Sequence, residues 1–167
     1  MNIYNRCHKN TIHNLEERFI MSNEYKIGSD NIIRRKVGRK WNPACPNDWF
    51  QPLVEKLQDN GSLSPKEDLL YGQCILSLIE IVLNNAKFRF QTEEIKDDCK
   101  GEMLKDVLYG LPKSFDRTKG STSYSYAFRI CYTSGIHILE KWNKYNEIFE
   151  PLDDNLQTNL DIDSEVL

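Results

Sequence analysis

The residues best suited to chemistry lie between positions 113 and 145, where basic and aromatic side chains are interleaved. The cations of this stretch are Lys113, Arg117, Lys119, Arg129, Lys141 and Lys144. The rings on or beside its expected last helix are Tyr124, Tyr126, Phe128, Tyr132, Trp142 and Tyr145. Cations can hold phosphates and rings can stack on exposed bases. The mixture therefore predicts nucleic-acid contact. The alternative is a helix that packs its rings into the core, but helical spacing cannot turn all of these rings inward.

Sequence motifs of catalysis and cofactor binding are absent. The chain contains no phosphate-binding G-x-x-x-x-G-K-[ST] loop, no G-x-G-x-x-G turn and no H-E-x-x-H pair. Its three histidines, His8, His13 and His137, are too scattered to predict a shared site. The acidic pairs at 93–94 and 97–98 are better explained by the positive end of a helix dipole than by a metal. We therefore expect no enzyme activity and no cofactor.

The five cysteines are Cys7, Cys45, Cys74, Cys99 and Cys131, with long spacings and no C-x-x-C pair. These spacings favour neither a zinc site nor a redox motif. Cys74, Cys99 and Cys131 fall in apolar helical patterns, so we interpret them as small buried hydrophobic residues in a reducing compartment.

The elements that must position the basic and aromatic stretch are expected to be helices. The first covers about 48–59, before the Asn60-Gly61 stop, and the second runs from a Ser64–Glu67 capping box to about Lys87. A third is capped by Thr92 and ends before Pro112, with Ile95, Cys99, Met103, Val107, Leu108 and Leu111 inward. The fourth is capped by Ser121 or Ser123 and runs to about Phe149.

These patterns predict an all-α fold, a compact bundle of about four helices with no strand. Residues 1–41 are expected to be a flexible basic leader, residues 42–149 the helical domain, and residues 150–167 an acidic tail that is disordered when free. The leader contains Arg34, Arg35, Lys36, Arg39 and Lys40. Two interpretations of this run stay open, a solvated arm and an arm that contacts phosphates.

The location and the start of the chain are also expectations. No run of about 18 apolar residues is present and the first residues lack the apolar block of a signal peptide, so we expect a cytoplasmic protein with no membrane contact. Met21, followed by Ser-Asn-Glu, is an alternative start. The formal net charge of −3 means that any basic surface must be local.

Several short motifs, taken together, resemble a known family. They are Glu102-Met103-Leu104, Gly110-Leu111, Ser114-Phe115-Asp116, Tyr124-Ser125-Tyr126-Ala127 and Arg129-Ile130-Cys131-Tyr132, preceded by the aromatic-basic segment Lys87-Phe88-Arg89-Phe90. This order is similar to region 2 of bacterial sigma factors, and more closely to the late-promoter sigma factor of T4-like bacteriophages. The resemblance covers about residues 64–145.

The resemblance implies two partners for the helical domain in the cytoplasm of a bacterial host. One is the clamp coiled coil of core RNA polymerase, which would bind the charged residues Glu93, Glu94, Lys96, Asp97, Lys100 and Lys105. The other is promoter DNA, a −10-like late-promoter element that the last helix would read and melt. The DNA contacts implied are Arg117, Lys119, Tyr124, Tyr126, Arg129, Tyr132, Thr133, His137 and Lys141.

The resemblance also implies a use for the acidic tail. In that family a short hydrophobic and acidic C-terminal epitope binds the sliding clamp of DNA polymerase, and here Leu160, Ile162, Val166 and Leu167 would form it. Two other functions are left open: a helical adaptor or inhibitor that binds polymerase without reading promoters, and an enzyme with a pocket that the sequence does not reveal.

Overall fold

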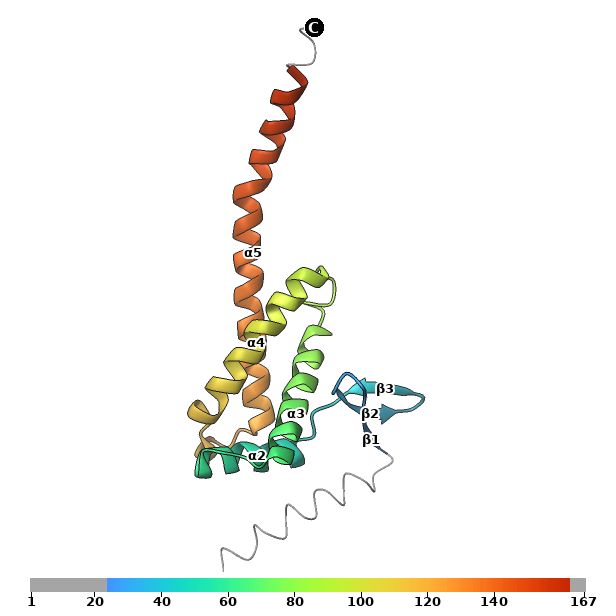
Figure 1. The fold of residues 1–167 in the computed structure, drawn as a ribbon, viewed down its shortest axis with the longest axis vertical. Coiled ribbons are helices and arrows are strands. Elements are labelled where there is room, and N and C mark those ends of the chain that lie inside the picture. The colour runs from blue at the N-terminus through green and yellow to red at the C-terminus, as the bar shows by residue number, and fades with distance from the viewer. Residues whose placement is uncertain (1–23, 163–167) are drawn as a thin grey trace, which may run out of the picture.

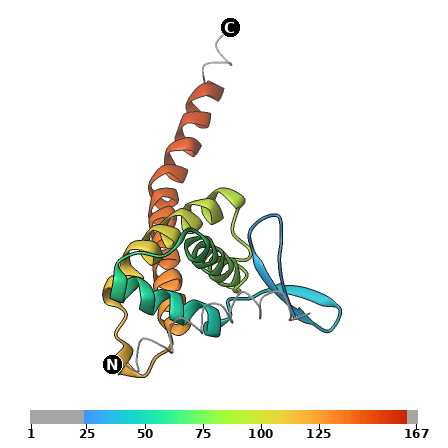
Figure 2. The ribbon, with the colours of Figure 1, turned by 60° about the horizontal axis from the view of Figure 1, so that its bottom comes forward.

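The protein is mostly helical, with a small three-stranded sheet beside the helices (Figure 1). The computed structural model describes residues 24–162, and the side chains of residues 24–148. The elements are β1 (Tyr25–Ile27), β2 (Ile33–Val37), β3 (Lys40–Pro43), α2 (Asn47–Asn60), α3 (Pro65–Leu83), α4 (Glu93–Ser114), the short 3₁₀ helix η1 (Arg117–Lys119) and α5 (Ser123–Ile162). Figure 2 shows α3 nearly end on, with α2, α4 and α5 around it and the sheet on the remaining side.

Helix α3 is the centre of the core. Its fully buried residues include Cys74, Ile75, Leu78, Ile79 and Val82. The expected capping box is confirmed, because Glu67 accepts hydrogen bonds from the N–H and the hydroxyl of Ser64 at 3.0 and 2.7 Å. Glu67 is buried and also accepts from Lys56 of α2 at 2.7 Å, so the same carboxylate begins α3 and fastens α2 to it.

Helices α4 and α5 pack side by side and make the most extensive contact between elements (Figure 1). Gly135 of α5 lies where they come closest. A Cβ atom at this position would stand 2.4 Å from the Met103 side chain and 2.7 Å from the Phe88 ring. The Cys99 thiol donates to the Gly135 carbonyl at 3.7 Å, and Trp142 Nε1 donates to Asp98 at 3.0 Å further along. A larger residue here would therefore have to displace the buried side chains of Met103 on α4 and of Phe88 in the turn before α4.

The helix ends differ from several expectations. Helix α3 ends at Leu83 instead of Lys87, because a turn follows that carries Phe88 into the core. Helix α4 continues through Pro112 to Ser114, and Gln58 of α2 donates to the Pro112 carbonyl at 3.0 Å. Leu108, expected inward, is 38% exposed because it lies at the edge of the buried stripe. Thr92 does cap α4, and its hydroxyl accepts from the Ile95 N–H.

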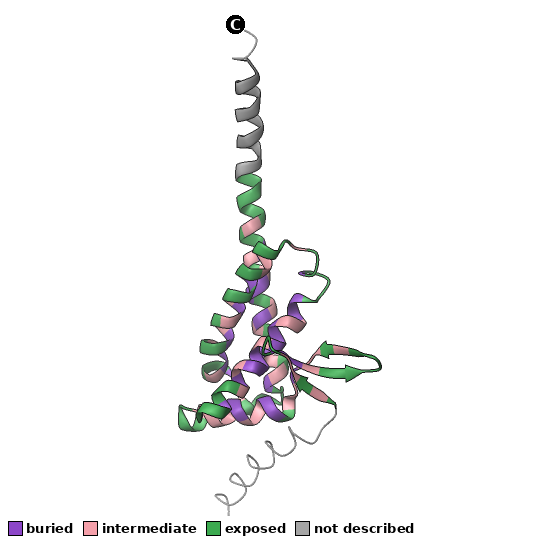
Figure 3. Ribbon diagram, turned by 45° about the vertical axis from the view of Figure 1, so that its right-hand side comes forward, coloured by how far each residue is buried: buried purple, intermediate pink, exposed green. Residues whose placement is uncertain are grey.

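Helix α5 also differs at both ends. It is capped by Thr122 rather than by Ser121 or Ser123, since the Thr122 hydroxyl accepts from the Ser125 N–H at 3.1 Å. It continues to Ile162 instead of ending near Phe149. The acidic segment 150–162 is therefore helical, which corrects the expectation of a tail disordered from its start. Figure 3 shows that α5 extends beyond the other helices and that its buried described residues lie in the part beside them.

The expectation of an all-α chain is wrong for residues 25–43. These residues form an antiparallel sheet in the order β1-β2-β3, where a flexible leader was expected. The Ile33 N–H donates to the Ser77 hydroxyl of α3 at 2.7 Å, and Tyr25 packs against Trp49 of α2 with ring centroids 5.0 Å apart. The strands are short and mostly polar, so hydrophobic alternation is too weak to predict them.

The cysteines expected inside the core are buried, and Cys45 is buried with them. Burial raises the pKa of the Cys131 thiol to about 12 and that of Cys99 to about 11, so both stay protonated. Cys7, the alternative start Met21 and the first two histidines lie outside the described residues. No helix within the described residues has the length and apolar character needed to cross a membrane.

Candidate nucleic-acid interface

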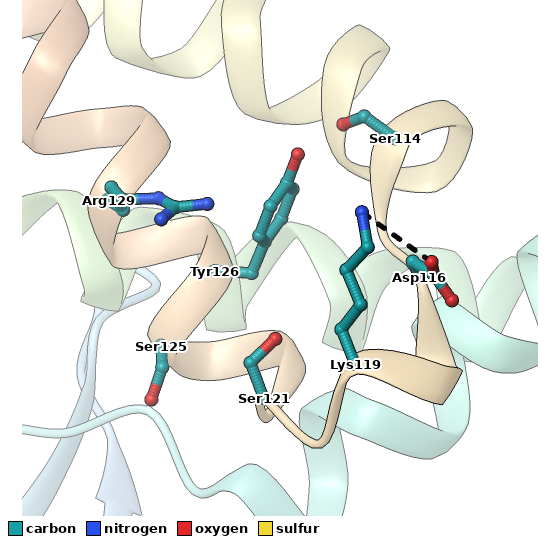
Figure 4. A pocket seen from close by; sticks show the side chains of 7 residues that line it. All are labelled: Ser114, Asp116, Lys119, Ser121, Ser125, Tyr126 and Arg129. Carbon is teal, nitrogen blue, oxygen red and sulfur yellow. Dashed lines mark ion pairs between the residues drawn. The ribbon is translucent and has the colours of Figure 1, made fainter.

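A cleft of about 410 Å³ lies where the end of α4, the η1 turn and the first turns of α5 meet. We call it the first cleft. It is lined by Ser114, Asp116, Lys119, Ser121, Ser125, Tyr126 and Arg129. Figure 4 shows the Tyr126 ring between the side chains of Arg129 and Lys119, with serine hydroxyls around them. A ring between two cations can stack on a base while both flanking charges reach phosphates.

The Tyr126 ring is held from two sides. The Phe115 ring, buried at the end of α4, packs on it with centroids 5.9 Å apart. The Arg129 guanidinium lies over it, with 5.3 Å between the guanidinium carbon and the ring centroid. Such a cation and ring attract each other, most strongly where water is excluded. Tyr126 is half-buried, so the ring is both oriented and accessible.

The η1 turn is fastened to α2 by Arg117. Its guanidinium donates to Gln58 at 2.8 Å, to Asp59 at 2.8 and 3.2 Å, and to the Glu55 carbonyl at 2.7 Å. Gln58 in turn donates to the Phe115 carbonyl at 2.7 Å. Arg117, expected to contact DNA, is therefore engaged within the protein, and it fixes the wall of the first cleft.

Asp116 is the carboxylate of the first cleft. It accepts from the Thr118 hydroxyl at 2.6 Å and from the Thr118 N–H at 2.9 Å, and Lys119 lies 3.7 Å away. The hydrogen bonds from Thr118, aided by Lys119, lower its pKa below the ordinary value of 3.8. Lys119 keeps 76% of its side chain exposed although it pairs with Asp116, so an incoming anion can still reach its ammonium group.

Three of the aromatic residues of α5 form a half-buried row instead of an open surface. Tyr124 and Tyr132 flank Phe128 at centroid distances of 6.3 Å, and Tyr132 meets the buried Phe88 edge-on at 5.6 Å. Burial raises the pKa of Tyr124. This row packs against the core, and Tyr126, which also packs against it, lines the first cleft as well.

The remaining predicted DNA residues lie further along α5. Thr133 is exposed, and His137 and Lys141 line a second cleft of about 270 Å³. The lining of this second cleft is Glu102, Asp106, Ser134, His137, Ile138, Glu140, Lys141 and Lys144. Ser134 donates to Asp106 at 2.6 Å. Carboxylates from both helices face the lysines here, so this cleft is less suited to phosphate than the first.

The charged residues predicted to bind polymerase lie along α4. Glu93, Glu94, Asp97, Lys100 and Lys105 are exposed, and Lys96 is half-buried. Two pairs are internal to the helix: Lys96 with Glu93 at 2.9 Å, and Lys105 with Glu102 at 2.6 Å. The outer face of α4, next to α5, therefore carries charges of both signs.

Sequence reasoning did not select the serines that line the first cleft. Ser114, Ser121 and Ser125 add hydroxyl groups that can donate to phosphate oxygens. The signal available was the run of Ser and Thr at 121–125, which was interpreted only as a helix start. Of the predicted sliding-clamp residues, Leu160 and Ile162 fall in the part of α5 whose side chains are not described, and Val166 and Leu167 lie outside the described residues.

Comparison with protein-family models, with curated proteins and with solved structures finds no match to this chain. Among the described residues no group of His, Cys, Asp and Glu side chains is arranged to hold a metal ion. Function is therefore inferred from the geometry of α4, η1 and α5.

Proposed function

We propose that the protein is a sigma-type specificity subunit of bacterial RNA polymerase, directed at phage late promoters. It docks on core polymerase through the charged face of α4 and captures the opened −10-like promoter strand at the first cleft. The observation that carries the proposal is the placement of Tyr126 between Arg129 and Lys119. Base stacking on a ring contributes about 1–3 kcal/mol, enough to offset much of the cost of unstacking a base pair step.

The construction of the first cleft supports this role because its parts are fixed before any ligand binds. Arg117 and Gln58 hold the η1 turn on α2, and Asn47 of α2 accepts from the Tyr124 N–H at 3.3 Å at the start of α5. A preorganised site loses less conformational entropy on binding.

The adjoining helix supports the polymerase contact. The outer face of α4 presents both signs of charge at Glu94, Asp97 and Lys100, while its inner face is fully used against α3 and α5. Complementary charges on a partner helix pair would fix the register of docking. The sliding clamp of DNA polymerase is proposed as the partner of the C-terminal tail on its hydrophobic and acidic composition alone.

The proposal is tested with the full chain and bacterial core RNA polymerase. Co-purification measures docking, and permanganate reactivity with run-off transcription on an A/T-rich −10 template measures opening. The Tyr126→Ala, Arg129→Gln double variant should bind core polymerase and fail to open the template, because both the ring and its cation are gone. The conservative pair Tyr126→Phe, Arg129→Lys is the control and should retain most opening.

Two outcomes would contradict the proposal. One is no binding of the wild-type chain to core polymerase. The other is core binding with no effect of promoter DNA, which would identify an adaptor or inhibitor instead.

A further inference from the structure

The sheet 25–43 concentrates positive charge on a protein whose formal net charge is −3. Residues 24–43 contain two carboxylates, Glu24 and Asp30, and six cations. The cations are Lys26, Arg34, Arg35, Lys36, Arg39 and Lys40. Strands β2 and β3 form a hairpin that projects from the side of α3 (Figures 1 and 3). The turn is made at Gly38, whose φ of +61° favours glycine.

The strand register divides these cations between the two faces of the sheet. On one face Lys26 is opposite Arg34, and Lys36 is opposite Trp41. The Lys26 ammonium lies 4.4 Å from the Trp41 ring centroid. On the other face Arg35 is opposite Tyr25 and 5.8 Å from its ring, and Lys40 is opposite Val37.

On the face that carries Tyr25 and Arg35, only the end nearest the helices packs against them. Ile33 is buried, and Tyr25 contacts Trp49 of α2. The tip is open, since Val37 is 59% exposed. Arg34 pairs with Asp30, and Arg35 lies 3.9 Å from Glu24. Within the described part of the chain no carboxylate pairs with the three cations of the tip, Lys36, Arg39 and Lys40.

We propose that the β2–β3 hairpin binds the phosphate backbone of duplex DNA, at a surface separate from the first cleft. A two-stranded ribbon fits the major groove of B-DNA. Cations on both faces of such a ribbon meet phosphates on both sides of the groove. A membrane surface would meet one face only and leave the other cations unused, so the charge distribution favours a duplex. The first cleft is built from α4, η1 and α5, whereas the hairpin leaves the body at α3.

The first experiment measures binding of the full chain to a fluorescent duplex that lacks any −10-like sequence, without polymerase, as a function of salt. The test variant is Lys36→Gln, Arg39→Gln, Lys40→Gln. The control, Lys66→Gln, Lys87→Gln, Arg89→Gln, removes the same charge from exposed positions elsewhere. Each lost phosphate contact should lower the slope of log K against log salt by about 0.9, and affinity at low salt should fall roughly tenfold or more. The control should stay within about twofold of wild type on the same reasoning.

The second experiment keeps every cation and so decides the matter even if the triple variant fails to fold. A photoreactive phenylalanine analogue replaces Val37 at the hairpin tip or Leu69 on α3, residues that are 59% and 60% exposed. The duplex should crosslink at position 37 and not at 69. Any one of three results would overturn the proposal. The first is equal crosslinking at positions 37 and 69, and the second is an equal loss of affinity in the control triple variant. The third is tighter binding to phosphatidylglycerol vesicles than to the duplex. Because the duplex is closed and no polymerase is present, failure of the proposed sigma function would leave these results unchanged.

Discussion

The two clefts along α5 are built from the same pair of helices and differ in charge. The first cleft places two cations, Lys119 and Arg129, beside the carboxylate of Asp116 and the half-buried ring of Tyr126. In the second, Glu102, Asp106 and Glu140 line the wall together with Lys141 and Lys144, and none of the described residues that line it is Phe, Tyr or Trp. Both lie along the contact between α4 and α5, so helix packing alone does not make a nucleic-acid site. What distinguishes them is the η1 turn, which brings Lys119 into the first cleft beside Tyr126, whose ring packs on Phe115 at the end of α4.

The contact of α4 with α5 is the feature that both clefts share, and Gly135→Ala should disrupt it. The added methyl group would lie 2.4 Å from Met103 and 2.7 Å from Phe88. Overpacking of this kind costs about 1–3 kcal/mol, less up to ~1 kcal/mol regained from helix propensity. We expect a net loss of about 1–2 kcal/mol in the free energy of unfolding, measured by urea denaturation.

Gly101→Ala on α4 is the matched control, because a Cβ there has nothing within 4 Å. It should stabilise the protein by roughly 0.5–1 kcal/mol through helix propensity. A Gly135→Ala variant as stable as Gly101→Ala would show that the helices can separate without cost, and both clefts would then be poorly fixed.

The clefts should differ most in their contribution to DNA binding. Tyr126→Ala should weaken binding of a forked duplex with a −10-like single-stranded arm by about tenfold, near the low end of the stacking range. Lys141→Gln in the second cleft should change it by about twofold or less, since carboxylates already offset that charge. Fluorescence anisotropy at fixed salt measures both.

Tyr126→Phe is the control for the ring, because it keeps stacking and the contact with Phe115. It should bind within about twofold of wild type, since base stacking requires the ring and not the hydroxyl. Equal losses for the Tyr126→Ala and Lys141→Gln variants would remove the functional distinction between the clefts.

Local sequence signals predicted the helices well and the contacts between the helices poorly. The Ser64–Glu67 box, the Thr92 cap and the Gly61 stop each act within a few residues. Helix α2 therefore ends, and α3 and α4 begin, close to where the sequence places these points. The attachment of the start of α5 to α2 and the role of Gly135 depend on tertiary contacts. Asn47 accepts from the Ser123 hydroxyl and the Tyr124 N–H, and the Met103 side chain lies against Gly135.

The sequence predicted which stretch of the chain holds the candidate site, but not how the side chains of that stretch are arranged. Composition indicated that residues 113–145 combine rings and cations, but Arg117, Tyr132 and Tyr126 look alike in sequence as members of that set. Their different roles follow from contacts with other elements. Arg117 binds Asp59 of α2, Tyr132 packs on the buried Phe88, and Tyr126 packs on Phe115 at the first cleft. The sheet was missed for the same reason: Ser77 and Trp49 support strands that have little strand pattern of their own.

The second cleft should gain affinity for DNA when its acids are neutralised. Glu102→Gln with Glu140→Gln leaves Lys141 and Lys144 unopposed by these carboxylates. Exposed charges of this kind contribute about 0.2–1 kcal/mol, so forked-duplex affinity should rise roughly threefold at low salt. Glu94→Gln with Asp97→Asn makes the same change in net charge on the exposed face of α4 and should leave affinity nearly unchanged. Equal gains in both variants would mean that net charge and not the cleft governs binding.

The smallest expected effect concerns Asp116, the carboxylate of the first cleft. Hydrogen bonds from the Thr118 hydroxyl and N–H hold its pKa below 3.8. Its stabilising contribution is therefore present above pH 3.8 and is lost as the pH falls through the folded-state pKa. Thr118→Val removes the hydroxyl and keeps the N–H, so the pKa should rise toward 3.8 and the loss should begin at higher pH. Carboxyl ¹³C NMR measures the pKa of Asp116. The control Thr133→Val, on the exposed face of α5, should leave that pKa unchanged. An unchanged Asp116 pKa in Thr118→Val would show that the Thr118 hydroxyl does not stabilise the charged carboxylate.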